Sequence, residues 1–224
     1  MIFGKPSPTG QNKSKQMKAP QQDSKPRQLC PPGVQPARCV WLIDIGTQLY
    51  KPTGQSQRKL IIGFETPNAR ADFGKGSQPF LIKRTFAFCM TARNKKTKLR
   101  EFIEGWRGKP YATDEEASDM DFSRLVGAAA IIVVQHKQSA SGTVFEDIAA
   151  ITPCPKAECA PQVNASIMYS IEDGMGGAYG KLPEWLQKQI NESKEFTDPS
   201  TPAEASGATS GAEQAAGDGG AVPF

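Results

Sequence analysis

Residues 79–108 read PFLIKRTFAFCMTARNKKTKLREFIEGWRG, and the spacing of their apolar side chains changes partway along. Over residues 79–91 apolar and polar residues alternate, which is typical of a β-strand with one buried face. After Thr97 the apolar residues recur three and four positions apart, which predicts an amphipathic helix that Thr97 caps and Gly108 ends. One face of the strand then carries Ile82, Arg84, Phe86 and Phe88, and the other carries Leu81, Lys83, Thr85 and Ala87.

Four further segments with strand-like composition surround this strand and helix. Residues 40–49 and 59–66 precede the pair, and residues 128–137 and 143–152 follow it. The resulting order is strand, strand, strand, helix, strand, strand, which is the chain order of the OB-fold. We therefore expect a mainly β protein with an OB-fold-like five-stranded barrel over residues 39–155 and a helical insertion between strands three and four. The first strand should place Trp41, Ile43 and Ile45 opposite Leu42 and Asp44.

Both ends of the chain have compositions that oppose folding. Residues 1–38 carry seven Lys or Arg against Asp23 alone, and residues 192–224 carry six acids against Lys194 alone. Neither segment has enough apolar side chains to offset the entropy of an ordered chain, so we expect a disordered basic arm and a disordered acidic tail. Between core and tail, residues 156–191 are expected to form an extension with one short helix near residues 183–191.

The composition argues against several classes of protein. The longest apolar run, residues 127–134, is too short to span a bilayer, and residues 1–5 do not resemble a secretory signal, so a soluble protein of the host-cell cytoplasm is expected. Five cysteines and a single histidine, His136, favour free thiols over a zinc site. The sequence has no nucleophile elbow and no phosphate loop, so we expect no catalytic residues, no metal and no cofactor. The acids between Asp114 and Asp121 are typical of a helix start.

Several short motifs resemble a family of small tailed-phage early proteins. The motifs are Ile45–Gln48, Gly63–Glu65, Lys83–Phe86, Lys98–Arg100 with Trp106–Tyr111, and Leu125–Gly127 with Ile148–Pro153. Members of this family are mostly recorded as uncharacterised or as putative single-stranded DNA-binding or replication proteins. The resemblance covers about residues 40–155 and implies a role in phage DNA metabolism without any catalytic residue to transfer.

The last residues resemble the tail of bacterial single-stranded DNA-binding proteins, in which an acidic, glycine-rich linker ends in a Pro-Phe tip that other enzymes bind. The corresponding residues here are Asp218, Val222, Pro223 and Phe224. This resemblance implies that host or phage replication and recombination proteins bind the tip. An ordinary frayed terminus is the alternative interpretation.

Single-stranded DNA binders combine cations that follow the phosphates with aromatic faces on which bases stack. On this basis the candidate DNA-binding residues are Trp41, Tyr50, Arg58, Lys59, Phe64, Lys83, Arg84, Phe86, Lys95, Lys96 and Lys98. Phe64, Phe86 and Phe88 could instead fill the barrel core, in which case Lys83 and Thr85 would face the DNA. Lys95, Lys96 and Lys98 could instead belong to a solvated loop and helix start, and Trp106 is expected in the core.

The function expected from the sequence is a non-catalytic single-stranded DNA-binding protein that acts in phage replication or recombination. Two alternatives remain: a protein-binding adaptor of a phage replication complex, and a structural phage protein. The sequence leaves open whether the chain forms a homo-oligomer.

Overall fold

The structure is a computed structural model, and it describes residues 1, 28–50, 53–74, 76–93, 95–155, 158 and 160–198. In chain order, with η for short 3-10 helices, the elements are β1 (Gly33–Tyr50), β2 (Gln55–Asp72), β3 (Ser77–Ala87), β4 (Thr91–Ala92), β5 (Lys95–Lys96), α1 (Lys98–Arg107), α2 (Asp114–Ser118), η1 (Phe122–Leu125), β6 (Ala129–Gln138), β7 (Val144–Pro153), β8 (Ile167–Tyr169), η2 (Ile171–Asp173), η3 (Tyr179–Lys181), α3 (Glu184–Asn191) and α4 (Lys194–Thr197). The expected order of three strands, a helix and two strands is confirmed.

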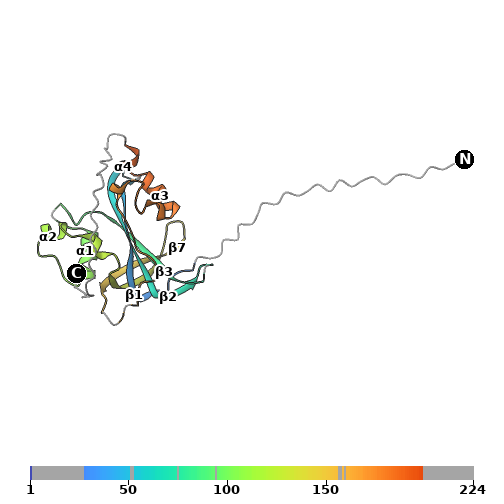
Figure 1. The fold of residues 1–224 in the computed structure, drawn as a ribbon, viewed down its shortest axis with the longest axis horizontal. Coiled ribbons are helices and arrows are strands. Elements are labelled where there is room, and N and C mark those ends of the chain that lie inside the picture. Colours follow the sequence, from blue (N-terminus) through green and yellow to red (C-terminus); the bar gives the residue numbers. More distant parts are fainter. Residues whose placement is uncertain are drawn as a thin grey trace, which may run out of the picture.

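The main sheet has the strand order β3-β2-β1-β6-β7, and all of these neighbours are antiparallel. The short strand β8 pairs in parallel with β1 at Trp41–Ile43. In Figure 1 the long strands β1 and β2 run through the centre, α1 and α2 lie to one side, and α3 and α4 gather near one end of the strands. The protein is therefore mainly β, built on an open antiparallel sheet whose edges are β3 and β7.

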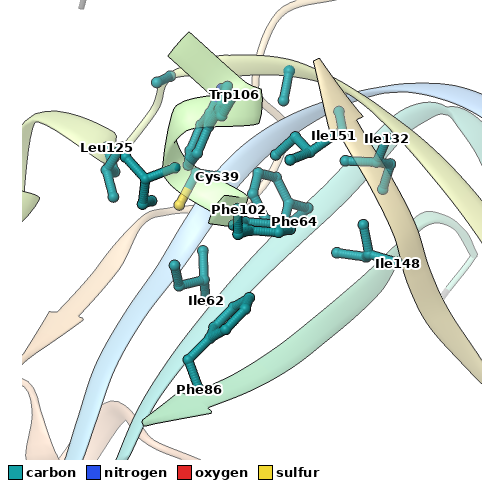
Figure 2. Packing of buried hydrophobic residues seen from close by; sticks show 14 of the residues in the cluster. Cys39, Ile62, Phe64, Phe86, Phe102, Trp106, Leu125, Ile132, Ile148 and Ile151 are labelled. Atoms are coloured by element: carbon teal, nitrogen blue, oxygen red, sulfur yellow. The ribbon is translucent and has the colours of Figure 1, made fainter. Parts of the chain in front are cut away.

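The larger core lies between the inner face of the sheet and α1 (Figure 2). Phe64 is fully buried at its centre, with its ring centroid 5.0 Å from that of Trp106 and 6.1 Å from that of Phe102. Phe86 is also buried and packs against Phe102. The proposed stacking roles of Phe64 and Phe86 are therefore wrong, because both rings face inward. Trp106 is in the core as expected, and its indole N–H donates to the Ala129 carbonyl oxygen at 2.8 Å.

The helix predicted after residue 97 is present with the predicted caps. The Thr97 hydroxyl accepts a hydrogen bond from the Arg100 backbone N–H at 3.2 Å. At the other end Gly108 has φ 72°, the left-handed conformation that glycine adopts readily. The apolar stripe of α1 is buried and anchors the helix on the sheet; it consists of Leu99, Phe102, Ile103 and Trp106.

A second core covers the outer face of β1 and β2. Ile43, Ile45 and Ile61 project from the strands, and the residues that cover them are Tyr169, Ile171, Leu182, Leu186 and Ile190 from the C-terminal extension. Glu65 fastens the extension further along β2, because its buried carboxylate accepts hydrogen bonds from the backbone N–H groups of Val163 and Asn164 at 2.5 and 2.9 Å. The predicted faces of the first strand are confirmed.

Both predicted terminal boundaries need correction. Gly33–Arg38, placed in the disordered arm, pairs with β6 within β1, because pairing and burial of Ala37 override a composition rich in Pro and Gln. Lys194–Thr197, placed in the disordered tail, forms α4. There Glu195 accepts hydrogen bonds from the Thr47 N–H and hydroxyl at 2.8 and 2.7 Å. Residues 2–27 of the arm and 199–224 of the tail lie outside the described residues.

Candidate functional site

A groove of about 590 Å³ lies along edge strand β3 and reaches the start of β7. It is open to solvent and combines aromatic, cationic and aliphatic side chains from four elements. The lining residues are Trp41, Leu81, Ile82, Lys83, Arg84, Thr85, Phe145, Glu146, Asp147 and Trp185. The alternative in which Phe86 belongs to the core is thus the correct one, and Lys83 and Thr85 line the groove.

A row of three paired residues runs across three strands, and the residues at its two ends, Trp41 and Lys83, line the groove. Trp41 in β1 is paired with Gly63 in β2, and Gly63 is paired with Lys83 in β3. A Cβ atom added to Gly63 would lie 2.8 Å from the Trp41 Cβ and 3.3 Å from its Cγ. The tryptophan side chain therefore rests directly on the glycine backbone, and any larger residue at position 63 would displace it.

Helix α3 brings a second tryptophan to the same groove. Leu186 and Ile190 are fully buried and fix the helix on the outer face of the sheet, whereas Trp185 is 44% exposed. The Lys83 ammonium nitrogen lies 3.3 Å from the centroid of the Trp185 ring. This is a cation–π contact between β3 and the C-terminal extension.

Arg84 spans the gap between the two edge strands. Its guanidinium donates a hydrogen bond to the Ile148 carbonyl oxygen in β7 at 2.6 Å. The guanidinium carbon also lies 5.4 Å from the Phe86 ring centroid and 5.8 Å from that of Phe102. Arg84 therefore supplies a positive charge to the lining of the groove, where β3 approaches β7.

Two carboxylates stand on the β7 side. Asp147 accepts a hydrogen bond from Lys137 at 2.5 Å and one from Gln135 at 3.2 Å, and Glu146 accepts one from the Cys30 backbone N–H at 3.2 Å. Burial raises the pKa of Asp147, but the donors Lys137 and Gln135 and the charge of Arg84 outweigh it, so the pKa lies below its usual value. Asp147 is therefore ionised at neutral pH, and its charge is opposed by Lys137.

Other proposed DNA-binding residues lie elsewhere. Tyr50 is exposed at the end of β1, nine residues and about 30 Å of strand beyond Trp41. Lys59 donates to the Gln57 side chain at 2.6 Å. Arg58 forms ion pairs with Asp44 at 2.5 Å and with Glu172 at 3.1 Å. It lines a separate pocket of about 410 Å³ that also contains Asp121 and Asp173, a surrounding that disfavours phosphate.

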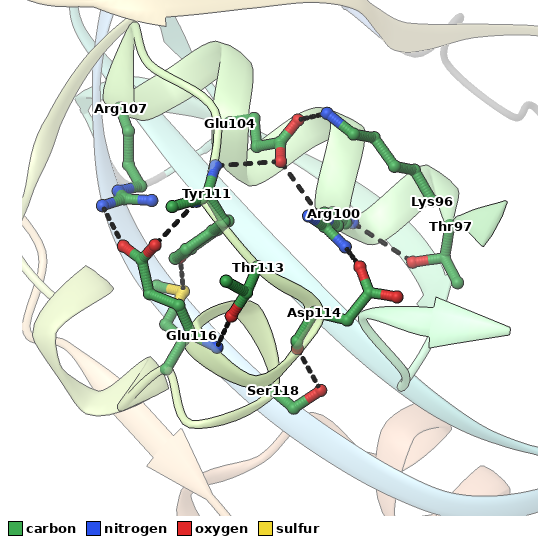
Figure 3. Close-up of polar contacts among 12 residues, drawn as sticks. Lys96, Thr97, Arg100, Glu104, Arg107, Tyr111, Thr113, Asp114, Glu116 and Ser118 are labelled. Carbon is green, nitrogen blue, oxygen red and sulfur yellow. Dashed lines mark hydrogen bonds and ion pairs between the residues drawn. The ribbon is translucent and has the colours of Figure 1, made fainter. Parts of the chain in front are cut away.

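The Lys95, Lys96 and Lys98 group is not among the residues that line the groove. It lies on β5 and at the start of α1, where Lys96 forms an ion pair with Glu104 at 2.7 Å (Figure 3) and Lys98 pairs with Glu101 at 2.7 Å. Glu104 also accepts hydrogen bonds from Arg100 and from the Tyr111 backbone N–H. Burial raises the pKa of Glu104, but Lys96, Arg100 and Tyr111 together bring it below its usual value. This network ties the helix to the loop that follows it.

Two residues of the groove, Trp185 and Phe145, were not among the candidate residues expected from the sequence. A signal for Trp185 was present, because it stands one position before Leu186 and therefore points away from the Leu186–Ile190 stripe. Phe145, which is 37% exposed, lies in a strand whose buried residues are Ile148 and Ile151. Its position opposite β3 depends on the approach of the two sheet edges, which local sequence does not specify.

Within the described part of the chain, no group of three or more His, Cys, Asp or Glu residues is arranged to hold a metal ion. Cys30, Cys39 and Cys89 are free thiols. Burial raises the pKa of Cys39 to about 12, so this thiol is unreactive at neutral pH. Over the same described ranges no helix has the length and apolarity to cross a membrane. The proposed partner-binding residues Asp218, Val222, Pro223 and Phe224 lie outside the described residues.

Comparison of the chain with family models, curated proteins and solved structures finds no match.

Proposed function

We propose that the protein binds single-stranded DNA in the groove on β3 and has no catalytic activity. The observation that carries this proposal is the convergence of Trp41, Trp185 and Phe145 with Lys83 and Arg84 in one open groove. Aromatic faces stack bases of any sequence at about 1–3 kcal/mol each, and the neighbouring cations follow the phosphates. No part of this mode of binding needs a catalytic geometry.

The strand order supports an OB-fold-like barrel. Closing the edge strands β3 and β7 against each other would complete a five-stranded barrel, and the hydrogen bond from Arg84 to Ile148 joins these strands at the point of closure. OB-folds bind single strands on the face of their second and third strands. Here those strands are β2 and β3, which supply Gly63 beneath Trp41 and the lining residues Leu81 to Thr85.

The biological setting follows from the sequence resemblance. We propose that the protein coats DNA during phage replication or recombination in the cytoplasm of the host cell. The basic residues of the N-terminal segment would add phosphate contacts, and the tip at Val222, Pro223 and Phe224 would recruit replication or recombination enzymes. A comparison of proteins captured from infected cells by the full chain and by a chain lacking residues 214–224 tests the tip. Identical sets of proteins would contradict its role.

The binding proposal is tested by fluorescence anisotropy with a labelled oligo-dT strand, the matching duplex and an RNA strand over a range of salt. We expect tight, salt-dependent binding to the single strand and weaker binding to the duplex, with a slope of log affinity against log salt of about 0.7 per neutralised phosphate. Lys83→Gln should lower that slope. Lys109→Gln removes the same charge from an exposed position after α1 and should change it little. Equal affinity for duplex, or binding that salt does not weaken, would contradict the proposal.

A protein-binding adaptor is the second candidate function, because β3 and β7 are sheet edges beside the groove and an extended peptide could pair with such an edge. The adaptor function would be favoured if the protein binds no single-stranded nucleic acid.

A further inference from the structure

The Trp185 ring face in the groove is already occupied by a cation from the protein itself. The Lys83 ammonium nitrogen lies 3.3 Å from the ring centroid, and both side chains line the groove. A nucleobase that stacked on this face of Trp185 would need the space that the ammonium now fills. Either the Lys83 ammonium or the Trp185 indole must therefore move before a base can stack on this face.

The backbone that carries the tryptophan is held in place. Its helix is held by the buried side chains of Leu186 and Ile190. The turn before the helix is held by the Gln187 side chain, which donates hydrogen bonds to the carbonyl oxygens of Leu182 and Tyr179 at 2.8 and 3.3 Å. Lys83 projects from edge strand β3 on a long, exposed side chain with several rotatable bonds. Movement of the lysine side chain is therefore easier than movement of the helix that carries the indole.

Two general preferences determine the direction of exchange. Stacking of a base on an aromatic ring is stronger than a cation–π contact at an exposed site. An ammonium displaced from the ring would also meet the phosphate of the stacked nucleotide, and neutralising that phosphate releases counterions. Both preferences favour the base on the ring and the ammonium on the phosphate.

We infer that Trp185 is a base-stacking residue whose face Lys83 covers in the free protein, and that strand entry transfers the Lys83 ammonium from the indole to the phosphate backbone. This inference rests on the proposed function and deepens it. It gives Lys83 two opposed effects on binding: it competes with the base for Trp185, and it holds the phosphate. It also makes the C-terminal extension part of the binding site.

The two effects of Lys83 can be separated by salt, because salt weakens the phosphate contact and leaves stacking largely unchanged. Lys83→Gln should bind oligo-dT more weakly than the wild type at low salt, with a slope reduced by about 0.7. At high salt the two binding curves should cross, and the variant should bind the strand more tightly. If Lys83 were only a phosphate contact, the variant would be the weaker binder at every salt concentration.

Trp185→Ala should bind oligo-dT about fivefold to 150-fold more weakly, and Trp185→Phe should retain part of the affinity. In the Trp185→Ala background, Lys83→Gln should weaken binding at low salt without any crossing at high salt. Urea unfolding of each variant checks the fold, which the partly exposed Trp185 should not determine.

The covering of the ring can be tested without DNA. Acrylamide quenching of the Trp185 emission, taken as the difference between each protein and its Trp185→Phe counterpart, should increase in Lys83→Gln. It should not change in Lys109→Gln.

Three results would overturn the inference. Salt-dependent binding of single strands with unchanged affinity in Trp185→Ala would refute it while leaving the proposed function intact. Absence of the high-salt crossing together with unchanged acrylamide quenching would show that Lys83 does not cover the ring. Failure of the folded wild-type protein to bind any single strand would remove both the inference and the proposed function.

Discussion

Replacing Gly63 with alanine tests how Trp41, a lining residue of the groove, packs on β2. The new Cβ would lie 2.8 Å from the Cβ of Trp41 in the neighbouring strand. Carbon atoms pack best at about 3.5–4.0 Å, so the two atoms must move apart by about 0.7 Å or more. No change of the Trp41 rotamer can relieve this contact, because the position of a Cβ atom is set by the backbone. The strands β1 and β2 must therefore separate locally.

The expected cost follows from these displacements. Overpacking a well-packed site costs about 1–3 kcal/mol. Replacing glycine by alanine also restricts the unfolded chain, which raises the free energy of unfolding by about 0.4–1 kcal/mol. We expect a net loss of about 1–2 kcal/mol in the free energy of unfolding. With a urea m-value of about 2 kcal/mol/M, the unfolding midpoint should fall by about 0.5–1 M.

Equilibrium urea unfolding monitored by circular dichroism measures this loss. Gly180→Ala is the matched control, because a Cβ at Gly180 meets no atom within 4 Å and this residue is exposed. It should leave the midpoint unchanged or raise it slightly. A Gly63→Ala protein as stable as Gly180→Ala would refute the argument that Trp41 rests on the glycine backbone. If Gly63→Ala is destabilised but binds oligo-dT as the wild type does, Trp41 is not a stacking residue.

Two further predictions concern carboxylates. Asp147→Asn removes a negative charge from the groove and releases Lys137, so it should raise single-strand affinity about twofold to tenfold at low salt. Glu101→Gln on α1 is the control. Unchanged affinity in Asp147→Asn would show that the bound strand lies away from β7. Burial raises the pKa of Glu195, but the two Thr47 donors outweigh burial, so the pKa in the folded protein lies below the usual value. The ionised Glu195 should therefore stabilise the fold by about 1 kcal/mol. This stabilisation should be complete above the ordinary Glu pKa of about 4.3 and be lost as the pH falls through the lower pKa of the folded protein. Glu195→Gln should therefore lower the free energy of unfolding at pH 7 and have little effect in acid, and an equal difference at both pH values, measured by urea unfolding, would contradict this role.

Local patterns in the sequence predicted the strands and helix α1 because they depend on neighbouring residues. The alternation in β3 placed Lys83 and Thr85 opposite Phe86, and the caps of α1 were predicted from Thr97 and Gly108. Pattern alone did not distinguish a stacking aromatic from a core aromatic. Phe64 and Phe86 are inside because α1 covers that face of the sheet, which is a tertiary arrangement that no local spacing encodes.

The groove itself was less predictable, because its residues come from segments far apart in the chain. Gly63 is paired with Trp41 on one side and with Lys83 on the other, and the reason for a glycine there becomes clear only once the strand register is known. The cations from Lys95 to Lys98 looked suitable for DNA by charge, but Lys96 and Lys98 form ion pairs with acids of α1. Net charge along a sequence does not show which cations already have partners.

The position of the C-terminal extension changes where the proposed binding unit must end. The extension covers the outer faces of Ile43, Ile45 and Ile61 but leaves Trp41 and Lys83 in the lining of the groove. A fragment that stopped at residue 155, the end of the predicted core, would expose that apolar surface and lose Trp185. It would also lose the hydrogen bonds that Glu65 and Thr47 make with the extension. The strands of the main sheet alone therefore cannot form the proposed site, and the proposed binding unit must extend through α4.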